Sequence, residues 1–467
     1  MIKKNTKIIA TIGPSSYSEN ILKKMVNAGM NAVRLNFSHG KYKEFREVIR
    51  LVRKIAADYK TPIAIIQDLQ GPKIRIGEMP ASGINLKNGR RIILTTKNII
   101  GNQKIIPVQY KNLPKEVKRG DTILIDDGLI ELRVIYDRFD KIYCKVIKGG
   151  NVKSHKGINA PGATIKADPI TSKDKKDVFF GVKNGVDYIA LSFVKSAGDI
   201  IRLKKLIKSA HGNARVIAKI ERPEAVRNLK KIIQAADGIM VARGDLGIEM
   251  PAETVPIIQK RIIHLANLYG KPVITATQIL QSMVENPIAT RAEISDAANA
   301  VFDHTDAMML SNETAVGKYP VEAVSTLTKV ACAVEKNLQK YKELLPTKRY
   351  FDMPISNATC LNAAKLAMDI NADAIVAVTL SGFTAQQISR HRLYIPIIAI
   401  TPSEKVANQL ALVWGVNKII VSKLHIENAT KEVREILIEK NLVKKGSEIV
   451  IVVNASKDEK LINTIII

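Results

Sequence analysis

The chain has 467 residues, enough for about three domains, and its 46% hydrophobic and 25% charged residues are ordinary for a water-soluble protein. Its formal net charge is +28, but the lysines are spread through every segment without a basic block or a nucleic-acid-binding motif, so nucleic acid is not an expected partner. Three isolated cysteines, with no signal-type apolar segment and no run long enough for a membrane span, predict a cytoplasmic protein without a membrane partner.

The first 70 residues alternate short apolar runs with helical patterns. Strands are predicted at residues 7–12, 31–37 and 62–69, with helices between them. Three βα repeats in so short a stretch favour an α/β fold with a parallel sheet.

The pattern changes over residues 71–169, where short alternating strands are separated by Gly, Asn and Asp turns. No helical period is visible there, so we expect a small antiparallel β domain inserted into the α/β domain. Its glycine-rich, basic exit at residues 149–162 suits a hinge or the flank of a lid.

Strand and helix patterns alternate again from about residue 170. Five more strands are predicted, at residues 187–194, 214–220, 238–242, 272–276 and 307–310. Together with the first three they would close a (β/α)8 TIM barrel from residues 1–70 and 170–342. A doubly wound open sheet is the alternative, although no G-x-G-x-x-G follows the first strand.

A polar stretch at residues 341–354 is predicted to be a linker to a C-terminal α/β domain, residues 355–467. Strands are expected there at residues 374–379, 396–400, 418–421 and 448–453. Residues 379–384 (TLSGFT) follow the first of these strands. Hydroxyls and a glycine leading into a helix can bind phosphate, but Ser and Thr also favour a simple capped turn, and the residues alone do not decide.

Charged residues follow two consecutive barrel strands. Lys219 and Glu221 come at the end of one strand, and Gly244 and Asp245 follow the next. Paired carboxylates suit Mg²⁺ (or Mn²⁺), the lysine can share phosphoryl or enolate charge, and the glycine admits a ligand close to the backbone. Salt-bridged strand ends would explain a single K-x-E, but four such residues on two strand ends favour a site.

The sequence resembles the pyruvate kinase family over nearly its whole length. The motifs that carry the resemblance are KIIATIGPSS (7–16), NAVRLNFSHG (31–40), DLQGPKIR (68–75), AKIERPEA (218–225), GIMVARGDLG (238–247), KPVITATQIL (271–280), ATRAEISDAANAV (289–301) and MLSNETAVGKYP (309–320). The resemblance implies a barrel with an inserted β lid and a C-terminal α/β domain, usually assembled as a homotetramer. It also implies Mg²⁺-dependent transfer of a phosphoryl group from phosphoenolpyruvate to ADP, the last step of glycolysis, giving pyruvate and ATP.

The resemblance also implies roles for individual residues. Arg34 would hold the substrate phosphate, Lys219 would stabilise charge on the transferring group, and Glu221 and Asp245 would bind the Mg²⁺. The remaining implied positions are the carboxylate or enolate contacts Gly244 and Thr277, the proton route through Thr277 and Ser311, and the nucleotide contacts Asn36, His39, Arg75 and Lys173.

Position 73 departs from many family members, which carry an acidic residue there and need K⁺. The implied K⁺ pocket consists of Asn36, Ser38, Asp68 and the carbonyl group of Leu69. With Lys73 as an internal cation, we expect an enzyme that does not require K⁺. The resemblance further favours phosphate binding by Ser381, Gly382 and Thr384, and thus a phosphorylated allosteric effector.

Two other functions are compatible with parts of the sequence. A Mg²⁺-enolate lyase or aldolase would also use paired carboxylates on a barrel, but would lack the inserted lid and the nucleotide contacts Arg75 and Lys173. A basic binding protein with an inactive site is disfavoured because every carried-over catalytic position is intact.

Overall fold

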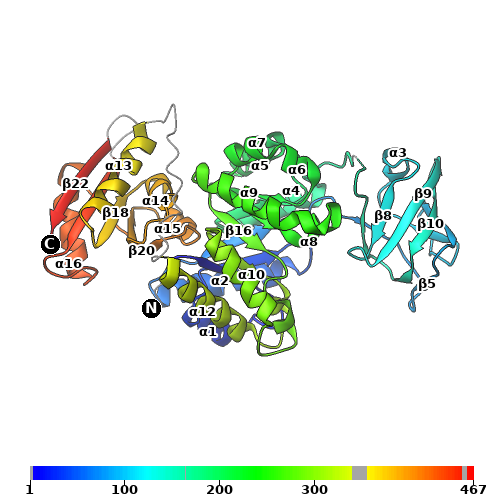
Figure 1. Ribbon diagram of the computed structural model, residues 1–467, viewed down its shortest axis with the longest axis horizontal. Helices are drawn as coiled ribbons and strands as arrows, with labels where there is room; N and C mark the ends of the chain where they lie inside the picture. Colours follow the sequence, from blue (N-terminus) through cyan, green and yellow to red (C-terminus); the bar gives the residue numbers. More distant parts are fainter. Residues whose placement is uncertain (1–3, 164, 339–354, 455–459) are drawn as a thin grey trace.

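The computed structural model describes residues 4–163, 165–338, 355–454 and 460–467. Figure 1 shows three parts along the long axis, with the barrel between the inserted β domain and the C-terminal α/β domain. The predicted linker at residues 341–354 lies outside the described residues. None of the described helices is long and apolar enough to cross a membrane.

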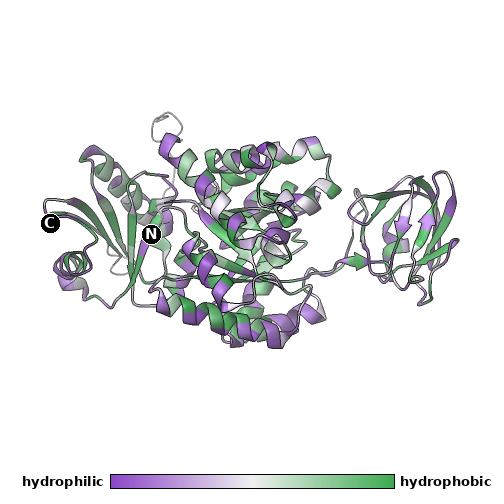
Figure 2. Ribbon diagram, turned by 90° about the horizontal axis from the view of Figure 1, so that it is seen from below, coloured by the Kyte–Doolittle hydropathy of each residue, from purple (hydrophilic) through white to green (hydrophobic). Residues whose placement is uncertain are grey.

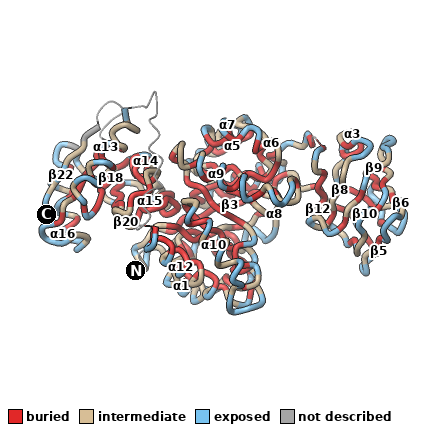
Figure 3. The backbone as a smooth tube through the Cα atoms, viewed as in Figure 1, coloured by how far each residue is buried: buried red, intermediate tan, exposed pale blue. Residues whose placement is uncertain are grey.

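Eight parallel strands form a closed barrel, as the sequence predicts. Neighbouring strands pair in the order β1-β17-β16-β15-β14-β13-β3-β2. Their side chains are almost all buried on both faces, which explains the continuous apolar runs and the red centre of the molecule in Figure 3. The strands are β1 (Lys7–Thr11), β2 (Ala32–Asn36), β3 (Ala64–Asp68), β13 (Tyr188–Leu191), β14 (Arg215–Ile220), β15 (Gly238–Ala242), β16 (Val273–Ala276) and β17 (Ala307–Leu310).

Helices surround the barrel and bury one apolar side against it. Ser18, Thr171 and Thr290 cap three of them by accepting a hydrogen bond from a first-turn backbone N–H. Hydrophilic and hydrophobic residues alternate along these helices in Figure 2. The helices are α1 (Glu19–Asn27), α2 (Tyr42–Asp58), α4 (Ser172–Lys183), α5 (Ala197–Ser209), α6 (Pro223–Arg227), α7 (Leu229–Ala235), α8 (Arg243–Glu249), α9 (Val255–Leu268), α10 (Arg291–Phe302), α11 (Asn312–Ala315) and α12 (Pro320–Leu338), with 3-10 turns η1 (Ala252–Thr254) and η2 (Gln281–Val284).

The inserted β domain, called the lid below, has its own apolar core and a seven-stranded sheet in the order β4-β12-β8-β9-β10-β6-β7. Two features differ from the prediction: β6 pairs with β7 in parallel, and a short helix is present, α3 (Leu113–Glu116). The strands are β4 (Ile74–Arg75), β5 (Ile84–Leu86), β6 (Arg91–Thr95), β7 (Ile105–Pro107), β8 (Thr122–Ile125), β9 (Ile130–Arg138), β10 (Lys141–Lys148), β11 (Gly150–Val152) and β12 (Gly157–Asn159), of which β5 and β11 form a separate pair.

The C-terminal domain contains the four predicted parallel strands and a fifth that the pattern did not reveal. Strand β22 pairs antiparallel with β21 at the edge of the sheet, whose order is β20-β19-β18-β21-β22. The elements are α13 (Ile355–Asp369), β18 (Ala374–Val378), α14 (Phe383–Ser389), β19 (Ile397–Thr401), α15 (Glu404–Leu410), β20 (Val416–Val421), η4 (Ile426–Asn428), α16 (Ala429–Glu439), β21 (Glu448–Asn454) and β22 (Lys460–Ile466).

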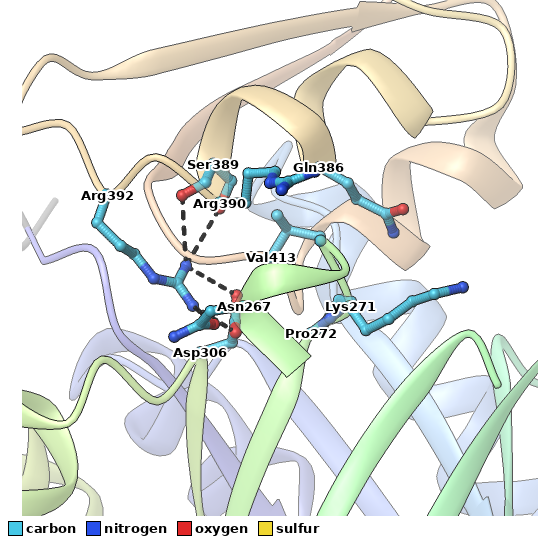
Figure 4. A pocket seen from close by; sticks show the side chains of 10 residues that line it. Asn267, Lys271, Pro272, Asp306, Gln386, Ser389, Arg390, Arg392 and Val413 are labelled. Carbon is cyan, nitrogen blue, oxygen red and sulfur yellow. Dashed lines mark hydrogen bonds and ion pairs between the residues drawn. The ribbon is translucent and has the colours of Figure 1, made fainter. Parts of the chain in front are cut away.

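A buried ion pair joins the barrel to the C-terminal domain. The Arg392 guanidinium, on the chain after α14, contacts the Asp306 carboxylate before β17 at 2.7 Å, and both side chains are about 4% exposed. Figure 4 shows Arg392 reaching down to Asp306 beside Asn267. Because Asp306 precedes its strand, this junction lies at the amino ends of the barrel strands. The carboxyl ends therefore face the lid, into which β3 leads directly.

Candidate active site

Lys219 is at the centre of a buried polar network at the carboxyl ends of the barrel strands. Its Nζ lies 2.9 Å from Glu221 Oε1 and 3.3 Å from Asp68 Oδ1, and it donates to Ser192 Oγ at 2.7 Å. Burial lowers the pKa of Lys219, but the attraction of Asp68 and Glu221 outweighs it and raises the pKa above the ordinary value of lysine. The network therefore keeps a fixed positive charge in the cleft.

Arg34 supplies a second cation to the same network. Its Nε donates to Asp68 Oδ2 at 2.7 Å, and its Nη1 donates to Thr11 Oγ1 at 3.2 Å. Burial alone would raise the pKa of Asp68, but Lys219 and Arg34 together lower it. Asp68, which the resemblance assigned to a K⁺ pocket, is thus an anion between two cations in this structure.

Glu221 and Asp245 lie close enough for their charges to interact. The Glu221 side chain is 1% exposed, and its Oε2 accepts a hydrogen bond from Phe193 N at 2.8 Å. Burial raises the pKa of Glu221, and Asp245 raises it further against the opposing effect of Lys219. Asp245 is more open, with its side chain 28% exposed in the first turn of α8.

The two carboxylates fit a Mg²⁺ or Mn²⁺ site that a substrate completes. Among the described residues, no group of three or more His, Cys, Asp or Glu side chains could enclose a metal ion. Mg²⁺ commonly binds through one or two carboxylates and takes its other ligands from water and substrate phosphates. Asp245 raises the pKa of Glu221, and a divalent cation held by these two carboxylates would relieve that repulsion.

Lys73 lies beside this pair of carboxylates, with its Nζ 3.9 Å from Asp245 Oδ1. Two groups assigned to the K⁺ pocket are occupied within the protein. Asn36 Oδ1 accepts from Ser38 N at 3.1 Å, and the carbonyl oxygen of Leu69 accepts from Ser192 Oγ at 2.7 Å. The structure therefore places the Lys73 charge at the carboxylate of Asp245.

Thr277 and Gly244 meet at the ends of neighbouring strands. Gly244 N donates to Thr277 Oγ1 at 2.8 Å, and the same hydroxyl donates to Ala276 O at 2.6 Å. Thr277 has a φ of +66°, an uncommon conformation for a β-branched residue. Arg243 stabilises it by donating from Nη2 to Thr277 O at 2.7 Å while pairing with Asp296.

Ser311 directly follows β17, at the same end of the barrel as Thr277. Its backbone N–H donates to Glu313 Oε2 at 2.7 Å, and Glu313 is fully buried. Glu313 Oε1 also accepts from Leu280 N at 3.0 Å, so one carboxylate ties the chain after β17 to the chain after β16.

Four cations surround His39, and two of them, Arg75 and Lys173, are also assigned to the nucleotide. Burial lowers the pKa of His39, and so do Arg75, Lys73, Arg34 and Lys173, in that order. Such a concentration of cations at one end of the cleft suits a polyphosphate. Asn36, the fourth assigned residue, ends β2, and His39 N donates to its carbonyl oxygen at 3.2 Å.

Lys173 and Arg75 in this group are fixed by carbonyl oxygens. Lys173 Nζ donates to Phe37 O at 2.7 Å and to Asp177 Oδ2 at 2.6 Å. Arg75 Nη1 donates to His155 O at 3.0 Å, within the lid.

The predicted effector loop lies at the other end of the barrel. Ser381 O accepts a hydrogen bond from Arg215 Nη2, and Gly382 has a φ of +81° and donates from N to Thr379 Oγ1 at 2.9 Å. Thr384 is only 3% exposed. The loop therefore contains a tight turn closed by Thr379, a helix that begins without a side-chain cap, and a nearby cation, Arg215 of β14.

Sequence reasoning missed two residues of the Lys219 network, Ser192 and Phe193. Both follow β13, and Phe193 has a φ of +55°, which turns its N–H toward Glu221. The only signal in the sequence was a polar residue at the end of an apolar strand, a weak indication. Because β13 pairs with β14, the residues after β13 lie beside Lys219 and Glu221 at the end of β14.

Comparisons with known proteins find pyruvate kinases along nearly the whole chain. A family model described as "Pyruvate kinase, barrel domain" matches residues 3–324, and one described as "Pyruvate kinase, alpha/beta domain" matches residues 357–467. A pyruvate kinase 2 from Synechocystis sp. is 45% identical over 430 residues, which are 91% of this chain and 72% of the relative. A pyruvate kinase from Staphylococcus epidermidis is 44% identical over 420 residues, 89% of this chain and 72% of the relative.

The fold agrees as well. The crystal structure of a pyruvate kinase from Cryptosporidium parvum superposes with a TM-score of 0.91 at 35% sequence identity, covering 98% of this chain and 96% of that one. Both the barrel and the α/β domain therefore have counterparts in sequence and in structure, and this chain belongs to the pyruvate kinase family of phosphotransferases.

Proposed function

We propose that the chain transfers the phosphoryl group of phosphoenolpyruvate to ADP, giving pyruvate and ATP in the cytoplasm. The observation that carries the proposal is the Lys219 network, in which Lys219 and Arg34 share the buried carboxylate Asp68 at the carboxyl ends of the barrel strands. Two such cations can neutralise charge on a transferring phosphoryl group, and phosphoryl transfer needs positioning and charge neutralisation more than covalent chemistry.

In this reaction the bond between phosphorus and the enolate oxygen breaks, and a bond to a terminal ADP oxygen forms. Arg34 binds the phosphate and Lys219 stabilises its charge as it moves. Gly244 N and Thr277 hold the carboxylate end, and Thr277 with Ser311 passes a proton to the methylene carbon of the enolate. A divalent cation between Glu221 and Asp245 would supply positive charge to the phosphate and enolate oxygens.

The nucleotide is proposed to bind beneath the lid. His39, Arg75 and Lys173, with Asn36, face the diphosphate of ADP, and the positive charge that lowers the pKa of His39 supports this placement. Because Arg75 belongs to the lid and Lys173 to the barrel, ADP would contact both, and a lid that closes would exclude water from the reaction.

The proposed enzyme does not require K⁺. In place of K⁺, the ammonium group of Lys73 would supply charge, and its 3.9 Å separation from Asp245 Oδ1 puts that charge at the metal carboxylate. Pyruvate formation from phosphoenolpyruvate and ADP with Mg²⁺ should be equal in sodium-only and potassium buffers, and Lys73→Glu should make it respond to K⁺.

The same assay separates the possible outcomes. Activity only with potassium would support the kinase assignment and contradict the proposal that Lys73 replaces K⁺. No pyruvate in either buffer, with sugar phosphates added, would overturn the kinase and direct attention to lyase chemistry on the same barrel.

Regulation and assembly are also proposed. A phosphorylated effector would bind at Ser381, Gly382 and Thr384, where the Arg215 side chain provides a cation from the barrel, and the enzyme would act as a homotetramer. If so, sugar phosphates should shift the phosphoenolpyruvate saturation curve, and Arg215→Ala should remove the shift without lowering the maximal rate. Sedimentation velocity would give the oligomeric state.

A further inference from the structure

The solvent-facing side of the lid sheet carries a group of cations and aromatic rings that the site above does not use. Strand register places Arg138 opposite Lys141, Tyr136 opposite Tyr143, and Arg133 opposite Lys145. The next strand continues the last of these rows, with Arg91 of β6 opposite Lys145. We call this surface the basic-aromatic face, and it comprises Arg91, Arg133, Tyr136, Arg138, Lys141, Tyr143 and Lys145, together with Phe139 in the β9–β10 turn.

The other side of the same strands forms the lid core. Val134 and Cys144, which alternate with the residues of the face, are buried. In Figure 1, β9 and β10 lie toward the end of the lid remote from the barrel, so the face is separate from the active-site cleft. Arg133 pairs with Glu131, while Lys141, Lys145 and Arg91 have no ion pair within the described parts of the chain.

The aromatic rings are unusually open to solvent. Tyr136 and Tyr143 stack at a centroid distance of 4.2 Å and an interplanar angle of 18°. Tyr136 is nevertheless 48% exposed. Phe139 is 84% exposed, and the Arg138 guanidinium lies 5.6 Å from its ring centroid. A solvated lysine-rich surface would explain the charges alone, but it gives no reason for exposed rings between them.

We propose that the basic-aromatic face binds single-stranded nucleic acid. Flat rings on a sheet surface stack with unpaired bases, and surrounding Arg and Lys side chains bind the phosphates between them. The lid has 19 Lys and Arg against nine Asp and Glu in residues 71–169, a denser excess than in the other 368 residues, which have 53 against 35. This inference is independent of the proposed reaction and gives part of the +28 charge a partner.

From the sequence, nucleic acid is not an expected partner because the lysines are spread through every segment without a basic block or a nucleic-acid-binding motif. The sheet brings them together, since Tyr136 and Tyr143 are seven positions apart but adjacent in space. An anionic membrane would attract the same charges, but membrane-surface binding usually relies on several inserted apolar side chains. On this face Phe139, 84% exposed, is the most exposed apolar side chain, Ile147 farther along β10 is 41% exposed, and the two tyrosine rings lie against each other.

The test measures binding of the full-length protein to a labelled 15-nucleotide single strand of mixed sequence, as RNA and as DNA, by fluorescence anisotropy between 50 and 200 mM NaCl. Two double variants remove the two components of the face: Tyr136→Ser with Phe139→Ser, and Arg138→Gln with Lys141→Gln. The matched control, Lys115→Gln with Lys118→Gln, removes two exposed charges elsewhere on the lid. Circular dichroism melts verify that each variant is folded.

The aromatic variant should bind about tenfold or more weakly with an unchanged salt slope, because stacking is insensitive to salt. The charge variant should bind more weakly and with a shallower slope, since fewer counterions are released. The control should stay within about twofold of the wild type. Binding equal to wild type in the aromatic variant, equal losses in the control, equal affinity for duplex, or binding only to phosphatidylserine vesicles would each overturn the proposal.

Discussion

Gly244 can be replaced by alanine without disturbing the fold, so a substitution there tests only whether a ligand needs the space. An ideal Cβ built on Gly244 would have its nearest contact, Thr277 Oγ1, at 3.6 Å, an ordinary van der Waals distance. The residue lies in the first turn of α8, where alanine is favoured over glycine by up to about 1 kcal/mol. Gly244→Ala should therefore keep or slightly raise the free energy of unfolding, and lower kcat/KM for phosphoenolpyruvate about tenfold or more by crowding the substrate.

Urea unfolding and steady-state kinetics on the same preparation check this prediction. Gly13→Ala is the contrasting variant, because a Cβ there would lie 2.5 Å from Ala315 O and must disturb the backbone. Full activity in a stable Gly244→Ala protein would contradict the placement of the substrate carboxylate against Gly244 N.

We propose both a structural and a catalytic role for Lys219, and Lys219→Met should reveal each. The substitution leaves Asp68 and Glu221 buried without their shared cation, which should cost about 3–5 kcal/mol of unfolding free energy. The loss of a fixed charge from the transition state should separately lower kcat about 10²- to 10³-fold.

The two effects are separated by measuring kcat at saturating substrate, at a temperature where unfolding curves show the variant to be native. Ser192→Ala is the control, because it removes a neutral acceptor of Lys219 and leaves both ion pairs. A folded Lys219→Met protein with wild-type kcat would exclude Lys219 from the chemistry.

At the scale of elements, α2 and α4 are joined by the carboxylate of Asp177, which also orients Lys173, a proposed nucleotide contact. Asp177 is fully buried, accepts from Tyr42 OH at 2.6 Å and pairs with Lys173 at 2.6 Å. Burial, then the hydrogen bond to Asp177, raises the pKa of Tyr42 to about 12, so its proton stays between the helices. Asp177→Asn should raise KM for ADP about five- to tenfold with little change in kcat, because Lys173 loses its charged partner.

Initial rates at varied ADP and at varied phosphoenolpyruvate measure this effect. Lys176→Ala, an exposed change on the same helix, is the control and should leave both KM values unchanged. An equal rise in KM for both substrates would mean that the substitution disturbs the cleft as a whole.

The barrel strands were predictable because a parallel strand buried on both faces leaves a continuous apolar run, and its polar residues mark the ends. Lys219 and Asp245 were found in this way. Strand β22 was not, since at a sheet edge its alternating pattern (KLINTII) competes with other interpretations. Asp68 ends β3 and Lys219 lies in β14, and the two strands are separated by β13. Their ion pair therefore depends on the order of the strands in the barrel, which no local sequence pattern encodes.

At the scale of the whole molecule, the junction between the barrel and the C-terminal domain is built from charges without access to water. Asp306 accepts from Arg392 and also from Trp414 N at 3.1 Å, and the Arg392 guanidinium lies 5.0 Å from the Trp414 ring centroid. Lys7 of the first strand donates to Val416 O across the same boundary at 2.8 Å. Such contacts are strong only while the two domains stay packed together and exclude water. A buried group that must gain a charge at the junction would therefore destabilise it.

His304, two residues before Asp306, is such a group, and His391, next to Arg392 in the chain, is a second histidine with a lowered pKa. Burial lowers the pKa of His304, and Arg392 lowers it further against Asp306, to about 4. Burial, with Arg390 and Lys365, likewise lowers the pKa of His391 to about 4. Both are neutral in the folded protein, and His304 O accepts from Arg392 Nη2 at 3.0 Å.

The unfolded chain, with a histidine pKa near 6.5, binds more protons than the folded one between pH 6.5 and 4. The stabilising contribution of neutral histidines is therefore complete above pH 6.5 and is lost as the pH falls, by up to about 1.4 kcal/mol per pH unit for each. Urea midpoints should be flat from pH 8 to 7 and fall steeply from pH 6 to 4.5. His304→Asn with His391→Gln should flatten the acid limb, whereas His264→Gln, on the exposed side of α9, should not. A wild-type midpoint that is the same at pH 7.5 and pH 5 would show that these histidines do not control the acid stability of the protein.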